Sequence, residues 1–302
     1  MRIPNRIRSS NAIDSGMPFL ANRNRYGIQL SADSKSQTDS LNSALVYVIG
    51  TLAYDFGDTV RRDYFLQNID PVSPDFRNDL MEYLAANPRE STAIYWTINI
   101  DETPVYAVQP AGLFAKNRYR QIHDFLGVLP DEDIPVQLSI AGKITGSVVL
   151  LQTGGIVPVI APSAEMFEWA ADSIANALED GIIDEAEKAE ILKCANNYHK
   201  RVYRQLRNLG QTPHDRAVNF AATIGYQRLI HNSQNKHLEL DGIEAKPSAT
   251  CRPNSDCWDL QLTLFDPEKP YRQAKTVYGF TVDVAEIDPV VLNNKIFEWK
   301  TI

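Results

Sequence analysis

The hydrophobic pattern of the chain begins after a polar N-terminal region. Residues 31–43, SADSKSQTDSLNS, have the serine and aspartate content of a linker. Residues 44–57, ALVYVIGTLAYDFG, are instead hydrophobic almost throughout and rich in valine, isoleucine and tyrosine. This stretch is too continuous for a surface helix and predicts a buried segment, whose type stays open. The pattern therefore predicts a polar, partly flexible arm over residues 1–40 and one domain over residues 41–302.

Two helices and a hairpin are predicted in the next part of the chain. Residues 73–88, SPDFRNDLMEYLAANP, begin with a capping serine and a proline, repeat hydrophobic residues every four positions and end at a proline. Residues 91–110 contain two β-rich runs around a turn at Asp101 and Glu102, which is typical of a hairpin. The hydrophobic stripe of the second helix is expected to consist of Leu113, Tyr119, Ile122 and Leu126.

The remaining pattern changes from strands to helices and back to strands. Residues 134–162 predict three strands with glycine-containing turns. Hydrophobic residues then recur at helical spacing over residues 164–181, 184–210 and 212–233, and β-rich runs return after His237. Because strands and helices do not alternate regularly, the order predicts an α+β fold. We expect a mainly antiparallel sheet with a helical central segment in a single large domain.

Charge and hydropathy limit the kinds of partner. The formal net charge of the 302 residues is −8, but residues 1–25 carry five arginines and one aspartate, so the rest of the chain carries −12. An acidic body repels phosphate groups, and we therefore expect no nucleic-acid partner. The N-terminus lacks a signal-peptide pattern, and polar residues and glycines interrupt the longest hydrophobic run, residues 147–162. The prediction is a cytoplasmic protein without membrane association.

Motifs of the common enzyme families are missing from the sequence. It contains no G-x-S-x-G elbow, no H-E-x-x-H, no G-x-G-x-x-G and no complete phosphate-binding loop. The five histidines have no partners at metal-ligand spacing, and each is predicted to be a surface or helix-end residue. The sequence therefore favours a non-enzymatic role, although the residues of a catalytic site need not be neighbours in the chain.

The three cysteines are the remaining candidates for chemistry. Cys251 and Cys257 flank a Pro-Asn-Ser turn, whereas Cys194 lies in a predicted helix and is expected to be a small buried residue. A reducing cytoplasm and an odd cysteine count disfavour a disulfide. Zinc prefers four ligands, with sulfur at about 2.3 Å, but the gap between these two cysteines is longer than usual, so spacing alone favours inert packing. Two further ligands would come from Cys194 and a histidine, or from the same cysteine pair of a second subunit.

Several blocks of the sequence are similar to a known domain. They cover residues 45–65, 95–110, 201–227 and 240–284, and include YWTINIDETPVYAVQP and the Cys-turn-Cys-Trp-Asp stretch CRPNSDCWD. In this order the blocks resemble the C-terminal domain shared by the PatA and PatG proteins of cyanobactin biosynthesis. The resemblance extends over roughly residues 41–302.

The resemblance implies a homodimer and a structural zinc, with Cys251 and Cys257 as ligands. PatA and PatG carry subtilisin-like protease domains, but this sequence has no serine block such as G-T-S-M, so cleavage and macrocyclisation are not implied. The implied function is that of a non-catalytic accessory module in cyanobactin-like ribosomal peptide biosynthesis, which binds the precursor peptide or organises the processing enzymes. The alternatives are a metal-dependent or acid–base enzyme that modifies the same peptides, and a self-associating structural domain.

Overall fold

The computed structural model describes residues 44–69, 76–127, 136–169, 185–231, 237–268, 275–292 and 296–301. The predicted N-terminal arm, residues 1–40, lies outside these ranges. Within them, no helix is long and apolar enough to cross a membrane.

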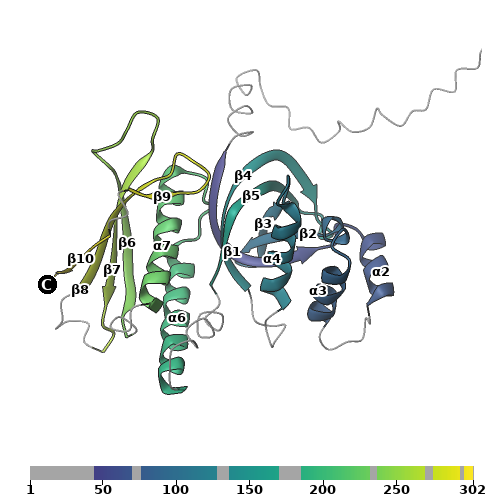
Figure 1. The fold of residues 1–302 in the computed structure, drawn as a ribbon, viewed down its shortest axis with the longest axis horizontal. Helices are drawn as coiled ribbons and strands as arrows, with labels where there is room; N and C mark the ends of the chain where they lie inside the picture. Colours follow the sequence, from purple (N-terminus) through teal and green to yellow (C-terminus); the bar gives the residue numbers. More distant parts are fainter. Residues whose placement is uncertain are drawn as a thin grey trace, which may run out of the picture. The chain divides into compact units, whose positions relative to one another are not determined.

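The first half of the described chain forms a closed β-barrel (Figure 1). Its strands follow one another in the order β1-β2-β3-β5-β4, and β4 pairs with β1 to close the barrel. All neighbours pair antiparallel except β3 and β5, which run parallel over a short stretch. The strands are β1 (Leu45–Asp55), β2 (Tyr95–Ile100), β3 (Thr103–Val108), β4 (Val136–Leu150) and β5 (Ile156–Glu168).

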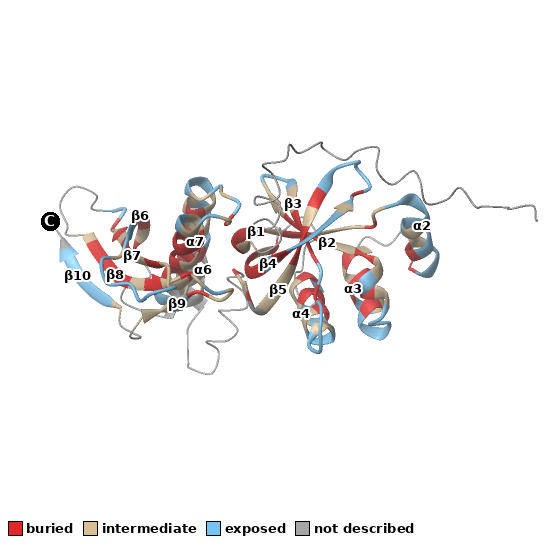
Figure 2. Cartoon of the chain, turned by 90° about the horizontal axis from the view of Figure 1, so that it is seen from above, coloured by how far each residue is buried: buried red, intermediate tan, exposed pale blue. Residues whose placement is uncertain are grey.

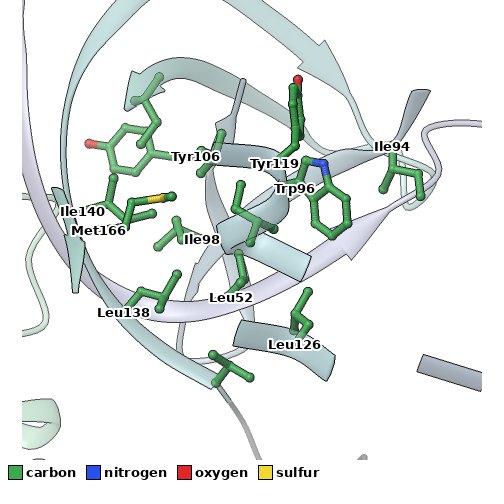
Figure 3. Close-up of a cluster of buried hydrophobic side chains, with 14 of the residues drawn as sticks. Leu52, Ile94, Trp96, Ile98, Tyr106, Tyr119, Leu126, Leu138, Ile140 and Met166 are labelled. Carbon is green, nitrogen blue, oxygen red and sulfur yellow. The ribbon is translucent and has the colours of Figure 1, made fainter. Parts of the chain in front are cut away.

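Helices complete the hydrophobic core of the barrel. They are α2 (Thr59–Asn68), α3 (Phe76–Ala86), the 3-10 helix η2 (Glu90–Ala93) and α4 (Ala115–Gly127). Figure 3 shows Tyr119 and Leu126 of α4 beside Trp96 and Leu52 of the barrel strands. Trp96 is fully buried, and its indole N–H donates to the carbonyl oxygen of Ser91 at 3.0 Å. The indole group is therefore buried with its polar atom satisfied, as a stable core requires.

The second half of the described chain forms an antiparallel sheet and two long helices. The strands run in the order β10-β8-β7-β6, and β9 pairs with β8. In Figure 2 the buried residues of this half gather on α6, α7 and the central strands, whereas β10 is exposed. The elements are α6 (Glu185–Gln205), α7 (Pro213–His231), β6 (Glu239–Pro247), β7 (Cys257–Phe265), β8 (Lys275–Asp283), β9 (Val290–Val291) and β10 (Phe297–Thr301).

Helices α6 and α7 cover one face of this sheet. Successive side chains of a strand point to opposite faces, and alternate residues of β7 and β8 are buried against the helices. These residues are Leu260, Leu262, Leu264, Tyr278, Phe280 and Val282. The described residues therefore form a single α+β domain with mainly antiparallel pairing and a helical central segment, which confirms the predicted fold class.

Strand β1 is buried on both of its faces. Val46 and Val48 belong to the core of the barrel, whereas Ile49 packs with residues of α6 and α7, and the ring of Tyr47 contacts Phe220 of α7 at 5.6 Å. A strand covered on both faces needs hydrophobic residues at consecutive positions. This explains why residues 44–57 showed no alternation and left the type of the segment open.

The predicted hairpin and first helix are confirmed, including the turn. Asp101 and Glu102 have φ angles of 48° and 65°, the left-handed values that a two-residue hairpin turn requires. In α3, Leu80 and Leu84 are fully buried. In α4, Tyr119, Ile122 and Leu126 are buried as expected, but Leu113 precedes the helix and is 98% exposed.

The prediction of three strands over residues 134–162 is wrong. Two long strands, β4 and β5, pair along most of their lengths, with register shifts between Ile140 and Gly142 and between Ile144 and Val148. Gly142 and Gly146 lie at such irregularities, whereas Gly154 and Gly155 lie in the turn that connects β4 to β5. Strand β5 also extends to Glu168, so the helix predicted over residues 164–181 is wrong at its beginning, and the rest of that prediction lies outside the described residues.

Candidate metal centre

The segment before β7 is a tight turn that brings the two cysteines together. The Ser255 N–H donates to the carbonyl oxygen of Arg252 at 3.1 Å, and Asn254 has a φ of 67°. Proline at the second position and a left-handed residue at the third are the pattern of a type II turn. The turn returns the chain to Cys257, the first residue of β7.

The two thiols differ in exposure and in surroundings. Cys251 is exposed, and its thiol donates to the carbonyl oxygen of Ser255 at 3.2 Å. Cys257 is only 5% exposed, although strand alternation places it on the face of β7 opposite Leu260 and Leu262. Burial, the hydrogen bond with the Cys251 side chain and the charge of Asp283 raise the pKa of Cys257 to about 11. Cys257 is therefore a protonated thiol at neutral pH unless a cation displaces its proton.

Carboxylates hold the turn against the neighbouring strand. Asp283 pairs with Cys257 across β7 and β8, and its Oδ1 accepts the backbone N–H of Asp256 at 3.1 Å and of Ala285 at 3.0 Å. Burial alone would raise the pKa of Asp283, but these two bonds, a hydrogen bond from the Ser255 side chain and the charge of Arg252 lower it. The carboxylate of Asp283 is thus occupied in fixing the turn.

Asp256 connects the turn to the segment after β8 and, through Trp258, to α7. Its Oδ1 accepts the indole N–H of Trp258 at 2.9 Å, and its carbonyl oxygen accepts the Val284 N–H at 2.9 Å. The ring of Trp258 in turn contacts His214 at 5.4 Å, edge to face. The cysteine turn is therefore tied both to β8 and to the start of α7.

The turn offers two potential ligands for a metal ion. Zinc takes four sulfur or nitrogen ligands in a structural site, and the turn offers the two thiols of Cys251 and Cys257. No group of three or more potential ligands occurs among the residues that the structure describes. Within the described residues, the two thiols therefore do not by themselves complete the four-ligand set of a structural zinc site.

Cys194 cannot complete this site within the same chain. Its thiol lies 3.8 Å from the carbonyl oxygen of Leu238, next to Glu239, which pairs with Phe265 at the far end of β7. Strand β7 has 9 residues, so its two ends lie about 26 Å apart. Cys194 is 7% exposed and belongs to the hydrophobic cluster beneath the sheet, which agrees with its predicted packing role.

His123 is buried, contrary to the prediction of a surface or helix-end position, and His199 is half-buried. His123 packs on Trp96 with ring centroids 5.3 Å apart, and burial lowers its pKa to about 4. His199 contacts Trp169 and the side chain of Gln137, and burial lowers its pKa to about 4 as well. Each ring lies against a tryptophan that is distant in the sequence, Trp96 of β2 for His123 and Trp169, which follows β5, for His199.

The contributions of Asp283 and Arg252 to the turn were not predicted. Asp256 and Trp258 adjoin Cys257 in the sequence, but Asp283 lies on another strand and reaches the turn only through the pairing of β7 with β8. The polar turn itself was the only local signal for this arrangement.

Comparisons with known proteins agree with the resemblance found in the sequence. Residues 45–146 match the protein family described as "PatG Domain", and residues 185–297 match "PatG C-terminal". A solved structure titled "PatG Domain of Unknown Function" is similar at 35% sequence identity with a TM-score of 0.70, covering 85% of this chain and 99% of that chain. No curated protein matches. Both cysteines of the turn lie within the second matched range.

Proposed function

Because the chain belongs to the family of the PatG domain of unknown function, we propose that it is a non-catalytic accessory module in cyanobactin-like peptide biosynthesis. In this role it binds the precursor peptide or organises the processing enzymes. The alternative is an enzyme that modifies the same peptides.

The observation that carries the proposal is the pair of thiols on one hydrogen-bonded turn. Cys251 is exposed and Cys257 lies beside it on the sheet face that the helices do not cover. A two-fold axis presents the same surface twice, so two copies would supply four thiols to one zinc ion. When bound by four thiolates, zinc links the two chains and keeps no open position for a substrate.

This arrangement couples dimerisation to metal and to pH. A ligand that binds only the dimer stabilises the dimer by mass action. Thiols must lose their protons to bind zinc, and the pKa of Cys257 is raised to about 11. Zinc affinity should therefore increase with pH across the neutral range, and chelators should favour the monomer.

The metal and the assembly are tested together. We would measure solution mass by light scattering and zinc content by plasma mass spectrometry on the full chain. One zinc per two chains is expected, and the Cys251→Ser, Cys257→Ser double variant should lose both zinc and dimer. Cys194→Ala is the matched control and should keep both. A monomer carrying one zinc per chain, or a dimer that persists without zinc, would contradict the bridging site.

The accessory role is tested with a labelled recombinant precursor peptide. We expect saturable binding by fluorescence anisotropy, and we expect the peptide mass to stay unchanged after prolonged incubation with the zinc-loaded protein. A change of peptide mass that survives repurification would favour the enzymatic alternative. Absence of binding, combined with capture of a purified processing enzyme of the same pathway, would assign the organising role.

A further inference from the structure

A cavity of about 420 Å³ lies where α7 crosses the outside of the barrel. Its walls come from β1, β4, β5, α4, α7 and the segment that follows β8. This volume lies within the range of roughly 300–1,000 Å³ that is typical of pockets for small organic ligands. No residue of the Cys251–Cys257 turn lines it, so an inference about the cavity does not depend on the zinc proposal.

The cavity is largely hydrophobic and has aromatic walls. Tyr47 and Phe220 meet edge to face at one side, and Phe167 of β5 is also part of the lining. The hydroxyl groups of Ser139 and Thr223 lie 2.7 Å apart and hydrogen-bond each other. These two polar groups are therefore already satisfied within the protein.

Asp288 differs from the other polar residues of the lining. It is the one charged side chain among the described residues that line the cavity. Asp288 as a whole is half-buried, but its Oδ1 is buried and has no hydrogen-bond partner among the residues that the structure describes. Leaving a buried acceptor without a donor costs about 1–3 kcal/mol, and more for a charged group. Such a group needs an explanation, and a ligand that donates to it is one.

We infer that this cavity binds an organic cation: an ammonium or guanidinium group on a hydrophobic stem. The cation would donate to the Asp288 carboxylate, and the stem would lie among the aromatic side chains. Aromatic faces also attract cations, more strongly where water is excluded. Two sources share this chemistry: a free amine, and a lysine or arginine side chain of a peptide, of which the second would extend the proposed peptide-binding role.

The first experiment compares two probes of nearly equal shape on the unmodified protein. Binding of 2-phenylethylamine and of its neutral analogue 2-phenylethanol would be measured by isothermal titration calorimetry at neutral pH. A charged hydrogen bond to the buried Oδ1 of Asp288 predicts that the amine binds about tenfold more tightly than the alcohol. Equal binding of the two probes, or no binding of the amine at millimolar concentration, would overturn the inference.

Two variants test whether the cation binds at Asp288. Asp288→Asn removes the charge and keeps the shape, and we expect it to reduce amine affinity about tenfold while leaving the affinity for the alcohol unchanged. Glu286→Gln is the matched control, because Glu286 is exposed and lies two positions earlier outside the lining. Thermal unfolding of each variant checks that the fold is intact. An Asp288→Asn protein that is folded and binds the amine as tightly as the unmodified protein would refute the assignment.

A third probe distinguishes the two sources. N-acetyl-lysine methylamide carries the same cation on a peptide unit. Tighter binding of this probe than of 2-phenylethylamine assigns the cavity to a basic side chain of a peptide, and the reverse order assigns it to a free amine. Both orders support the inferred site. If the zinc-dependent dimer failed its own test, this result would still stand, because neither probe reports on the metal.

Discussion

Replacing Gly210 by alanine should destabilise the domain by more than the cost of a left-handed backbone conformation alone. Gly210 has a φ of 66° and lies between α6 and α7, directly against β1. Its carbonyl oxygen accepts the Tyr47 N–H at 3.0 Å. A methyl group built at position 210 would lie 2.1 Å from the carbonyl oxygen of Tyr47, a contact that real structures do not show. The atom in the way belongs to the backbone of β1, so the loop that contains Gly210 and strand β1 would have to move apart.

The cost follows from the bonds that this separation breaks. The left-handed φ costs alanine about 1–2 kcal/mol, partly offset by the lower entropy of the unfolded chain. The bond between Tyr47 and Gly210 contributes about 1 kcal/mol. The Tyr47 carbonyl oxygen also accepts from the side-chain amide of Asn219 at 2.8 Å, and Asn219 is fully buried. Weakening that bond adds about 2 kcal/mol, and we expect a total loss of about 4 kcal/mol.

Urea unfolding monitored by tryptophan fluorescence measures this loss of unfolding free energy. A Gly154→Ala variant separates the cost of the left-handed backbone conformation from the cost of the steric contact. Gly154 has a φ of 85°, but a methyl group there would meet nothing within 4 Å. Gly154→Ala should therefore cost only about 1 kcal/mol from the backbone conformation. Equal losses for the two variants would refute the steric part of the reasoning and would mean that the contact between this loop and β1 is easily relaxed.

Three further predictions concern stability. Ile122→Ala should cost about 3 kcal/mol in urea unfolding because Ile122 is fully buried, whereas Leu113→Ala at a 98% exposed position should change the free energy of unfolding by less than about 0.5 kcal/mol. His123 has a pKa lowered to about 4 by burial, so its contribution is complete above the unfolded value of about 6.5 and is lost as pH falls towards about 4. That loss is about 3 kcal/mol, and a His123→Asn variant should show a flatter dependence of unfolding free energy on pH in this window. Asp283→Ala removes the acceptor of two backbone N–H groups and should cost about 2 kcal/mol, with weaker zinc binding in a competition titration.

The sequence pattern predicted those elements whose signal is local. The hairpin turn at Asp101 and Glu102 and the periodic residues of α3 depend on neighbours in the chain, and both were correct. The second sheet and the closure of the barrel depend on pairings between distant strands, such as β1 with β4. Gly142 and Gly146 were misinterpreted as turn residues, because a glycine occurs both at a bulge and at a turn and the two cases differ only in the pairing with the partner strand.

The candidate sites show the same division between local and distant information. Cys251 and Cys257 are neighbours in the sequence, and the polar turn between them was predicted. Asp288 could not be identified from its sequence context, because the cavity that it lines is assembled from β1, β4, β5, α4 and α7. The burial of His123 likewise results from Trp96, which approaches it from a strand of the barrel.

The burial of β1 on both faces has a consequence for the folding of the domain. The strand supplies Val46 and Val48 to one hydrophobic core and Tyr47 and Ile49 to the environment of α6 and α7. The two matched family ranges therefore do not correspond to two independent folding units. A fragment ending before α6 would expose the outer face of β1 to water, and a fragment beginning at α6 would lack the surface against which its helices pack. Loss of either half should unfold the other, so the chain should behave as one cooperative unit in equilibrium unfolding.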